Sequence, residues 1–99
     1  MEKRTPQAKL SLVHELVQAG SVRATSSAYE GALELGIADL AGMCAVVMTL
    51  TPSCFYKSMT TYADHRVWQD VYHAKANGRD VYLKLTVVDG VLIVSFKEL

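Results

Sequence analysis

Residues 55–72 read FYKSMTTYADHRVWQDVY, and they have the composition of two β-strands joined by a turn. Aromatic and β-branched side chains, which favour strands, occupy both ends of the segment. The polar residues 63–65 interrupt them and predict a hairpin with a three-residue loop. In that register Met59 lies opposite Gln69, with Lys57 one diagonal step away, so Lys57 and Gln69 point out of the same face of the sheet.

The C-terminal half continues this strand pattern. Residues 81–88 and 91–98 are strand-like on either side of Asp89-Gly90, a pair that is typical of a two-residue type I′ turn. Such a turn places Val88 opposite Val91 and Tyr82 opposite Lys97. The apolar face of this hairpin, which helices are expected to cover, then comprises Val81, Leu83, Leu85, Val87, Leu92, Val94 and Phe96. The opposite face carries Tyr82, Lys84, Thr86, Ser95 and Lys97, interrupted by Val91 and Ile93.

The length of the loop between the two hairpins determines how the strand that ends at His73 pairs with the strand that follows the loop. A four-residue loop over residues 74–77 pairs His73 with Gly78 and places Gln69 opposite Tyr82. One row of side chains then crosses the sheet, consisting of Met59, Gln69, Tyr82 and Lys97, flanked by Lys57. Directly opposed side chains in a row are about 5 Å apart, so their tips can meet over one substrate atom. A solvated sheet face without function has the same pattern, and spacing alone favours that interpretation.

Three helices are predicted in the N-terminal half. They run from Thr5-Pro6 to Gly20, from Thr25–Ser27 to Gly36, and from about Asp39 to Leu50. Ser27 and Glu30 fit a capping box at the start of the second helix. Helices followed by an antiparallel meander are typical of an α+β fold, here in a single domain over residues 1–99.

Charge and composition restrict the classes of partner. Ten cations balance ten anions among 99 residues, so a broad basic surface for nucleic acid is not expected. No apolar run has the length of a membrane span and the N-terminus lacks a signal-peptide core, which favours a cytoplasmic protein without membrane association. Cys44 and Cys54 are predicted to be free thiols, because they form no CxxC pair and no histidine lies at metal-ligand spacing.

Several longer segments resemble one protein family. These segments are FYKSMTTY, DH and WQDVY within residues 55–72, MEKRTP at the N-terminus and VYLKLTVVDGVLIVSFKE at the C-terminus. Together they resemble the MqsR family of bacterial messenger-RNA-cleaving toxins over essentially the whole chain. The resemblance implies a RelE-like α+β fold, with N-terminal helices packed on one face of an antiparallel sheet. It also implies endonucleolytic cleavage of messenger RNA at short GC-containing sites, which arrests translation.

The same resemblance implies a protein partner besides the messenger RNA. A cognate antitoxin is expected to hold the toxin inactive and to carry the complex onto DNA, so that DNA is contacted only through the antitoxin complex. Any zinc is expected on the antitoxin, because this sequence has no ligand set for a metal. No cofactor is expected for the chain itself.

Lys57, Gln69 and Tyr82 match the catalytic lysine, glutamine and tyrosine of that family. No histidine is compelling as a catalyst and no carboxylate pair has metal-site spacing, which favours metal-independent attack by the ribose 2′-hydroxyl. Tyr82 is the best candidate for proton transfer. Lys57 can stabilise phosphate charge or protonate the leaving oxygen, whereas Gln69 cannot titrate and is expected to orient the substrate.

Further residues are predicted to contact the substrate, namely Lys97, Met59, Lys84, Arg66 and His73. A solvated cation is an equally good interpretation of Arg66 and Lys84, and His73 fits either a surface turn or a substitute acid or base. Tyr56, Tyr62 and Trp68 can stack on bases or pack in the core. The alternative functions are a non-catalytic RNA- or protein-binding regulatory module and a structural partner subunit.

Overall fold

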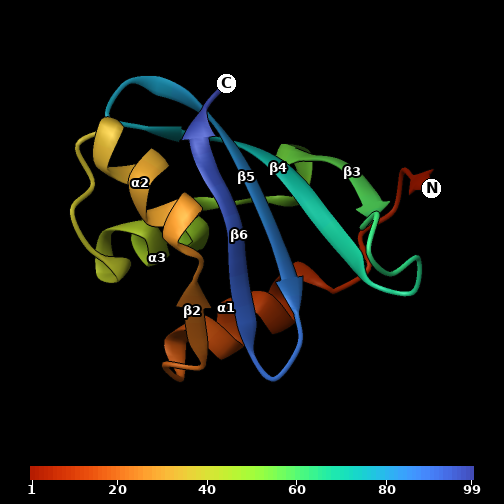
Figure 1. The fold of residues 1–99 in the computed structure, drawn as a ribbon. Helices are drawn as coiled ribbons and strands as arrows, with labels where there is room; N and C mark the ends of the chain where they lie inside the picture. Colours follow the sequence, from red (N-terminus) through yellow and green to blue (C-terminus); the bar gives the residue numbers. More distant parts are fainter.

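The computed structural model describes all 99 residues and contains three helices and a six-stranded sheet (Figure 1). The helices are α1 (Leu10–Gln18), α2 (Ser26–Glu34) and α3 (Leu40–Thr49), followed by one turn of 3-10 helix, η1 (Pro52–Cys54). The strands are β1 (Glu2–Lys3), β2 (Val22–Ala24), β3 (Phe55–Thr60), β4 (Trp68–Ala76), β5 (Arg79–Val87) and β6 (Val91–Glu98). The strand order is β1-β3-β4-β5-β6-β2, antiparallel except for the β2–β6 pair. The predicted α+β class is confirmed.

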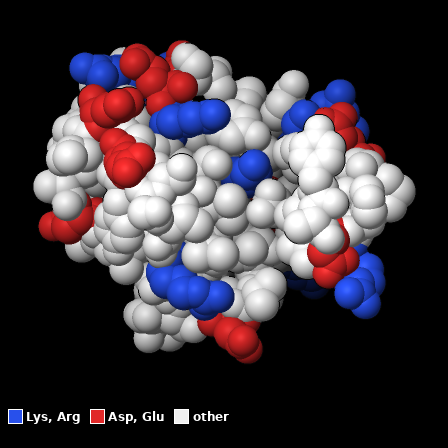
Figure 2. Space-filling model, in the orientation of Figure 1, with Lys and Arg blue, Asp and Glu red and all other residues white.

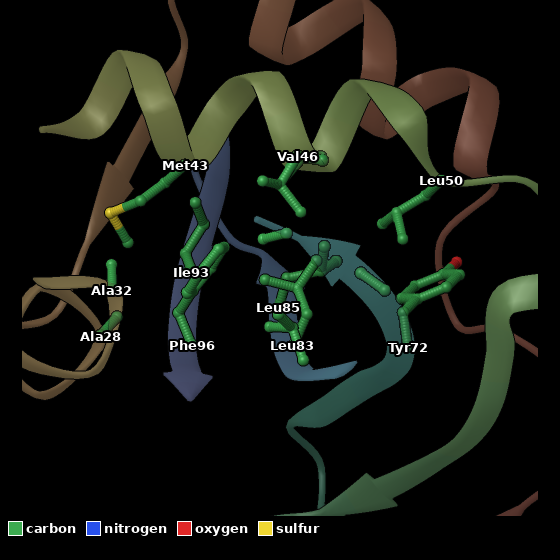
Figure 3. Close-up of a cluster of buried hydrophobic side chains, with 14 of the residues drawn as sticks. Ala28, Ala32, Met43, Val46, Leu50, Tyr72, Leu83, Leu85, Ile93 and Phe96 are labelled. Carbon is green, nitrogen blue, oxygen red and sulfur yellow. The ribbon is translucent and has the colours of Figure 1, made fainter. Parts of the chain in front are cut away.

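The hydrophobic core lies between the helices and one face of the sheet (Figure 3). Met43 and Val46 of α3, and Leu50 directly after it, point toward strand side chains that include Leu83 and Leu85. They recur along α3 and its C-cap at the three- and four-residue spacing that was predicted from the sequence. All three helices contribute to this core, so the opposite face of the sheet is left without a helical cover.

Helix α2 approaches β6 closely at Gly31. A Cβ atom placed on Gly31 would lie 1.9 Å from the main-chain oxygen of Phe96, far inside van der Waals contact. Ala28 and Ala32, which flank it on the helix, are fully buried. The absence of a side chain at Gly31 therefore sets the distance between α2 and the sheet.

The predicted start of α1 at Thr5-Pro6 is wrong, because the helix begins at Leu10 and its N-cap side chain makes no capping bond. The segment before the helix is held by Asp70, which is buried in β4. The Asp70 carboxylate accepts hydrogen bonds from the main-chain N–H groups of Gln7 (2.9 Å) and Ala8 (3.0 Å). A carboxylate of the sheet thus satisfies the main-chain donors that a helix N-cap would otherwise have satisfied.

The other two helices begin where they were expected, although α2 uses another cap. Thr25 caps α2, since its Oγ1 accepts a hydrogen bond from the N–H of Ala28 (3.1 Å). The capping box predicted at Ser27 is therefore not formed. Asp39 caps α3 by accepting a hydrogen bond from the N–H of Gly42 (2.8 Å).

The turn between β4 and β5 has two residues rather than the predicted four. Asn77 (φ 51°) and Gly78 (φ 77°) form it with the positive φ angles of a type I′ turn. Ala74 and Ala76, which were predicted to lie in the loop, continue β4 and are buried in the core. The side-chain amide of Asn77 donates to the main-chain oxygen of Leu35 (2.7 Å), which fixes the turn to the end of α2.

This shorter turn changes the register between β4 and β5. His73 pairs with Tyr82, so the predicted pairings of His73 with Gly78 and of Gln69 with Tyr82 are both wrong. His73 also lies within a strand and not in a surface turn.

The β5–β6 hairpin does not close with the predicted two-residue turn. Val87 pairs with Val91, which leaves three residues in the loop. The N–H of Val91 donates to the main-chain oxygen of Ser21 (2.9 Å), directly before β2, and so it cannot pair with Val88. The guanidinium of Arg23 in β2 donates to the loop oxygens of Asp89 and Val88 at 3.1 and 3.2 Å. Strand β2, which the sequence did not predict, therefore determines this turn.

A bulge in β6 restores the predicted register farther from the turn. The pairing shifts between Lys84 and Leu85, which leaves Val94 as the extra residue of β6. Beyond the bulge Tyr82 pairs with Lys97, as predicted.

The bulge also exchanges the faces predicted for the first half of β6. Val91 and Ile93 are fully buried in the core, whereas Leu92 and Val94 are half-buried on the opposite face. The hydroxyl of Thr25 donates to the main-chain oxygen of Val94 (2.8 Å). Thr25, the residue that caps α2, thus also provides a hydrogen-bond donor for the main-chain oxygen of the bulge residue.

The close approach of α2 to β6 can be tested by replacing Gly31 with alanine. In an exposed helix this change would be stabilising by about 1 kcal/mol. Here the added methyl group meets main-chain oxygen, and we expect the free energy of unfolding in urea to fall by about 2–3 kcal/mol. The matched control is Ser27→Ala on the exposed side of α2, which should stay within about 0.5 kcal/mol of the wild type. Equal stability of Gly31→Ala and wild type would contradict the packing described here.

Candidate functional site

The open face of the sheet, defined as the face without a helical cover, carries most of the residues that were predicted to be functional. Alternation along the strands points their side chains away from the core. These residues are Lys57, Met59, Gln69, His73, Tyr82, Lys84 and Lys97. Because Tyr82 does not lie opposite Gln69, they occupy three rows across the sheet instead of one.

The first row contains Tyr82. His73 lies opposite it on β4 and stacks on Tyr56 of β3, with the two ring centroids 4.5 Å apart. Lys97 lies opposite Tyr82 on β6, and its Nζ is 5.2 Å from the centre of the Tyr82 ring. The Tyr82 phenol therefore has an ammonium group on one neighbouring strand and an imidazole on the other.

The second row contains two lysines. Lys57 on β3 and Lys84 on β5 both pair with Val71 of β4, which is fully buried between them. Burial lowers the pKa of Lys84 below its ordinary value, and the positive charges of Lys97 and Lys57 lower it further. Lys84 thus gives up its proton more readily than an exposed lysine does.

Lys57 forms an ion pair with Glu2. The two-residue strand β1 pairs with the edge of β3, with Glu2 opposite Met59, and this pairing brings the Glu2 carboxylate to Lys57. The hydrogen bond from Lys57 lowers the pKa of Glu2, and the same bond raises the pKa of Lys57. Both groups are therefore charged at neutral pH, and the carboxylate offsets part of the Lys57 charge.

The third row consists of Met59 and Gln69, which pair as predicted. Gln69 lies four residues from His73 along β4, about 13 Å at the usual rise of a strand, and His73 is the partner of Tyr82. Gln69 and Tyr82 are therefore not opposite each other but lie two rows apart, which corrects the single row expected from the sequence.

Arg66 lies apart from the open face. Its side chain is 91% exposed and is paired with Asp64 in the same loop, with Arg66 Nε 3.0 Å from Asp64 Oδ1. The cavity that it lines also contains Asp70, which belongs to the other side of β4. The structure therefore does not bring Arg66 together with Tyr82 and the lysines.

Tyr72 is the other tyrosine of β4 and β5, and it faces the core. It is fully buried, its hydroxyl has no hydrogen-bond partner, and burial raises its pKa to about 12. A phenol in this position keeps its proton and is out of reach of a substrate on the open face. Of these two tyrosines, Tyr82 is thus the one available for chemistry on the open face.

Two parts of this surface were not predicted. The pairing of Glu2 with Lys57 depends on a strand of two residues, which is too short to give a periodic pattern. Tyr56 was not expected beside His73, because strict alternation would place it opposite to Lys57. An irregularity between Phe55 and Lys57 turns the Tyr56 ring onto the open face.

Charge is dispersed on the surface that Figure 2 shows. Basic and acidic side chains both appear there, and uncharged surface separates the basic ones. This dispersion agrees with the formal net charge of zero. The lysines of the open face form a local group of cations rather than part of a broad basic surface.

Other chemical features of the chain are few. No group of three or more histidine, cysteine, aspartate or glutamate residues is placed so that it could hold a metal ion. Cys44 and Cys54 are free thiols, as predicted. None of the helices has the length and apolar character needed to cross a membrane.

The fold and the open face together define an α+β protein with one uncovered sheet face. On this face the Tyr82 phenol lies among lysines, an arrangement suited to a phosphodiester substrate. Residues 5–98 match the family described as "Motility quorum-sensing regulator, toxin of MqsA". The chain belongs to this toxin family. It is 59% identical over 98 residues to the mRNA interferase toxin MqsR of Escherichia coli (strain K12), an alignment that covers 99% of each chain.

The ion pair at the edge of the open face can be tested by NMR titration of the Glu2 carboxyl. In the wild type we expect its pKa to lie below the ordinary value of 4.5, because the Lys57 ammonium favours the carboxylate. The Glu2–Lys57 pair then stabilises the fold above that pH, and its contribution is lost as the pH falls through the lowered pKa. In Lys57→Met the Glu2 pKa should rise toward 4.5.

The Asp64 carboxyl is an internal control for this titration. Its pKa is lowered by hydrogen bonds from Arg66, so it should be the same in the wild type and in Lys57→Met. A Glu2 pKa that does not respond to Lys57→Met would mean that the pair does not form.

Proposed function

We propose that the chain is an endoribonuclease toxin that cleaves messenger RNA in the cytoplasm and arrests translation. Its family is described as the toxin of MqsA, and its relative from Escherichia coli is named an mRNA interferase toxin. The observation that carries the proposal is the pairing of Tyr82 with Lys97, one row away from Lys57 and Lys84 on an uncovered sheet. These residues offer proton transfer and positive charge where a single RNA strand has access.

The proposed reaction is a transesterification within the RNA. The ribose 2′-oxygen forms a bond to the adjacent phosphorus atom, and the bond from phosphorus to the 5′-oxygen breaks. A base takes the proton of the 2′-hydroxyl, and an acid gives a proton to the leaving 5′-oxygen. The products are a 2′,3′-cyclic phosphate and a 5′-hydroxyl, and protons balance across the step.

In this proposal the tyrosine, the histidine and the three lysines of the first two rows each have a part in the reaction. Tyr82 takes part in proton transfer, and His73 opposite it is a second group able to do so. Lys57 and Lys97 stabilise the negative charge that grows on the phosphate oxygens. Lys84 is suited to give its proton to the leaving oxygen, because its pKa is lowered.

Gln69 and Met59 act on a neighbouring nucleotide in this proposal, since they lie two rows from Tyr82. The amide of Gln69 cannot titrate, so its part is to orient the RNA by hydrogen bonding. Selection of short GC-containing sites belongs to such contacts and not to the phosphate centre. Arg66 has no part in the centre, because it lies outside the open face.

A cognate antitoxin is the proposed protein partner. It neutralises the toxin, and it carries the complex to DNA that the toxin alone does not bind. Any zinc in that complex is assigned to the antitoxin.

The first test is the chemistry of the cleaved ends. Purified protein should cut a 5′-labelled messenger RNA into fragments that end in a 2′,3′-cyclic phosphate, followed by fragments that begin with a 5′-hydroxyl. The rate should be the same in excess EDTA, because lysine and tyrosine side chains supply the proposed charge and proton transfer. Loss of cleavage on chelation, with recovery on adding Mg²⁺, would contradict this reaction.

The same experiment separates the proposed function from its alternatives. A shift in RNA mobility without new termini would indicate a non-catalytic RNA-binding module. Neither cleavage nor a shift would indicate a structural or protein-binding subunit.

The second test concerns the pairing of Tyr82 with Lys97. Tyr82→Phe removes the hydroxyl and keeps the ring, so the fold should survive while the cleavage rate falls by about 10²–10⁴-fold. Lys97→Ala should also slow cleavage. The double variant should lose less than the product of the two single losses, because neighbouring groups that act on one phosphate are not independent.

Matched controls are Tyr29→Phe on α2 and Lys9→Ala before α1, which should cleave at the wild-type rate. Thermal unfolding of all variants should show the wild-type transition. If the rate losses of the two single variants multiply in the double variant, Tyr82 and Lys97 do not act in a shared centre. A normal cleavage rate for Tyr82→Phe would mean the same.

A further inference from the structure

A pocket of about 550 Å³ lies on the helical side of the sheet, between the start of α1 and the β3 end of the core. Its walls come from the segment that leads into α1, from the first residues of η1 and β3, and from Tyr72 of β4. None of its lining residues belongs to the three rows of the open face. The pocket is therefore separate from the proposed catalytic centre.

The Tyr72 hydroxyl is a buried polar group of this pocket that lacks a partner. The side chain is 1% exposed, and its hydroxyl forms no hydrogen bond within the chain. Figure 3 shows the hydroxyl oxygen at the edge of the core cluster, directed away from Leu83 and Leu85. Because burial raises the pKa of Tyr72 to about 12, the hydroxyl stays a donor at neutral pH. A ligand that accepts its hydrogen bond would remove the cost of leaving this group unpaired.

The first turn of α1 supplies further donors beside the same pocket. The N-cap residue Lys9 makes no side-chain capping bond. The N–H groups of Leu10 and Ser11, which both line the pocket, donate no hydrogen bond within the chain. The N-terminus of a helix carries partial positive charge, and no acidic residue occupies the first turn of α1. An anion between this turn and Tyr72 would accept hydrogen bonds from both.

The charged side chains of the pocket are all cations. Arg4 and Lys9 line it, and no acidic residue does. Arg4 makes one long hydrogen bond, of 3.4 Å, to the main-chain oxygen of Tyr56, so most of its guanidinium donors are free for a ligand. The Asp70 carboxylate on this side of β4 already accepts hydrogen bonds from the segment before α1. Two cations without a carboxylate partner favour an anionic ligand.

The number and direction of the donors suit a phosphate group better than a carboxylate. Two main-chain N–H groups, the hydroxyls of Ser11 and Tyr72 and two cationic side chains can surround the three terminal oxygens of a phosphate monoester. A carboxylate has only two oxygens, in one plane. The pocket is also larger than a phosphate group, and Leu10, Phe55 and two prolines give it apolar walls. Pockets of this size and composition hold small organic molecules.

We propose that this pocket binds a small phosphate monoester, at a site separate from the RNA on the open face. The phosphate lies between the first turn of α1 and the Tyr72 hydroxyl, within reach of Arg4 and Lys9, and the organic part lies against the apolar walls. The inference goes beyond the proposed function and does not depend on it, because the pocket and the catalytic rows lie on different sides of the sheet.

The test is an NMR titration of the wild-type protein with inorganic phosphate and with phenyl phosphate. The main-chain amide signals of Leu10 and Ser11 should shift and reach saturation. Phenyl phosphate should bind about 10-fold more tightly than phosphate, because its ring is buried against the apolar walls. The control amides are those of Ser26 and Ser27, which begin α2 but line no pocket, and they should not shift. Leu10 and Ser11 signals that do not respond to either probe would overturn the site.

Two variants test the donors. Tyr72→Phe should raise the Kd of both probes by about 10- to 100-fold, because it removes a hydrogen bond to a charged group, and Arg4→Met should raise it by about 10-fold or more. Without ligand, Tyr72→Phe should be no less stable than the wild type, since the hydroxyl has no partner to lose. The matched controls, Tyr29→Phe and Lys75→Met, change exposed side chains far from the pocket lining and should bind as the wild type does. Wild-type affinity in Tyr72→Phe and Arg4→Met would mean that phosphate binds elsewhere.

A third arm distinguishes a free monoester from the phosphates of the substrate. A 2′-O-methyl oligoribonucleotide lacks the nucleophile of the proposed reaction and stays intact. It should leave the Leu10 and Ser11 signals unshifted and the Kd of phenyl phosphate unchanged. Displacement of phenyl phosphate by the oligonucleotide would assign the pocket to the RNA chain and overturn the separate site. A protein that binds phenyl phosphate as expected but cleaves no RNA would overturn the proposed function alone.

Discussion

The two-residue turn at Asn77 and Gly78 fixes the geometry on which the open face depends. Its positive φ angles allow a tight connection, and the Asn77 amide ties it to the end of α2. This turn places His73 opposite Tyr82 and assigns Lys57, Lys84 and Lys97 to adjacent rows. A change of one residue in its length would move every side chain of β5 to the other face relative to β4.

One-sided packing explains how a chain with no net charge presents a group of cations. The helices bury the apolar face of the sheet, and the polar side chains of the same strands are left together on the other face. The bulge at Val94 lets each half of β6 present the right side chains to each face. It brings Val91 and Ile93 into the core, and it leaves Lys97 opposite Tyr82 on the open face. The function proposed for this face therefore needs local placement of charge and not a basic composition.

The sequence predicted what short-range patterns determine. The α3 stripe, the β3–β4 register and the Tyr82–Lys97 pair follow from local periodicity and turn chemistry, and they are confirmed. The β4–β5 register was wrong although Asn77-Gly78 is itself the local pattern of a two-residue turn. Two other errors arose where a distant segment competes for main-chain groups. Ser21 takes the amide of Val91, and Asp70 replaces the cap expected at Thr5. Such contacts join residues far apart in the chain, and no local pattern encodes them. The roles of Lys57, Gln69 and Tyr82 came from family resemblance, and they remain predictions.

The order of the strands in the sheet differs from their order in the chain, and this has a consequence for synthesis. β1 and β2 are made before β3 and β6, the strands with which they pair. Contacts of such long range form late compared with local ones. A nascent chain from which β6 is still missing lacks the partner of both β5 and β2, and it lacks Lys97 beside Tyr82. The proposed catalytic rows are therefore incomplete until β6 has been made and has paired.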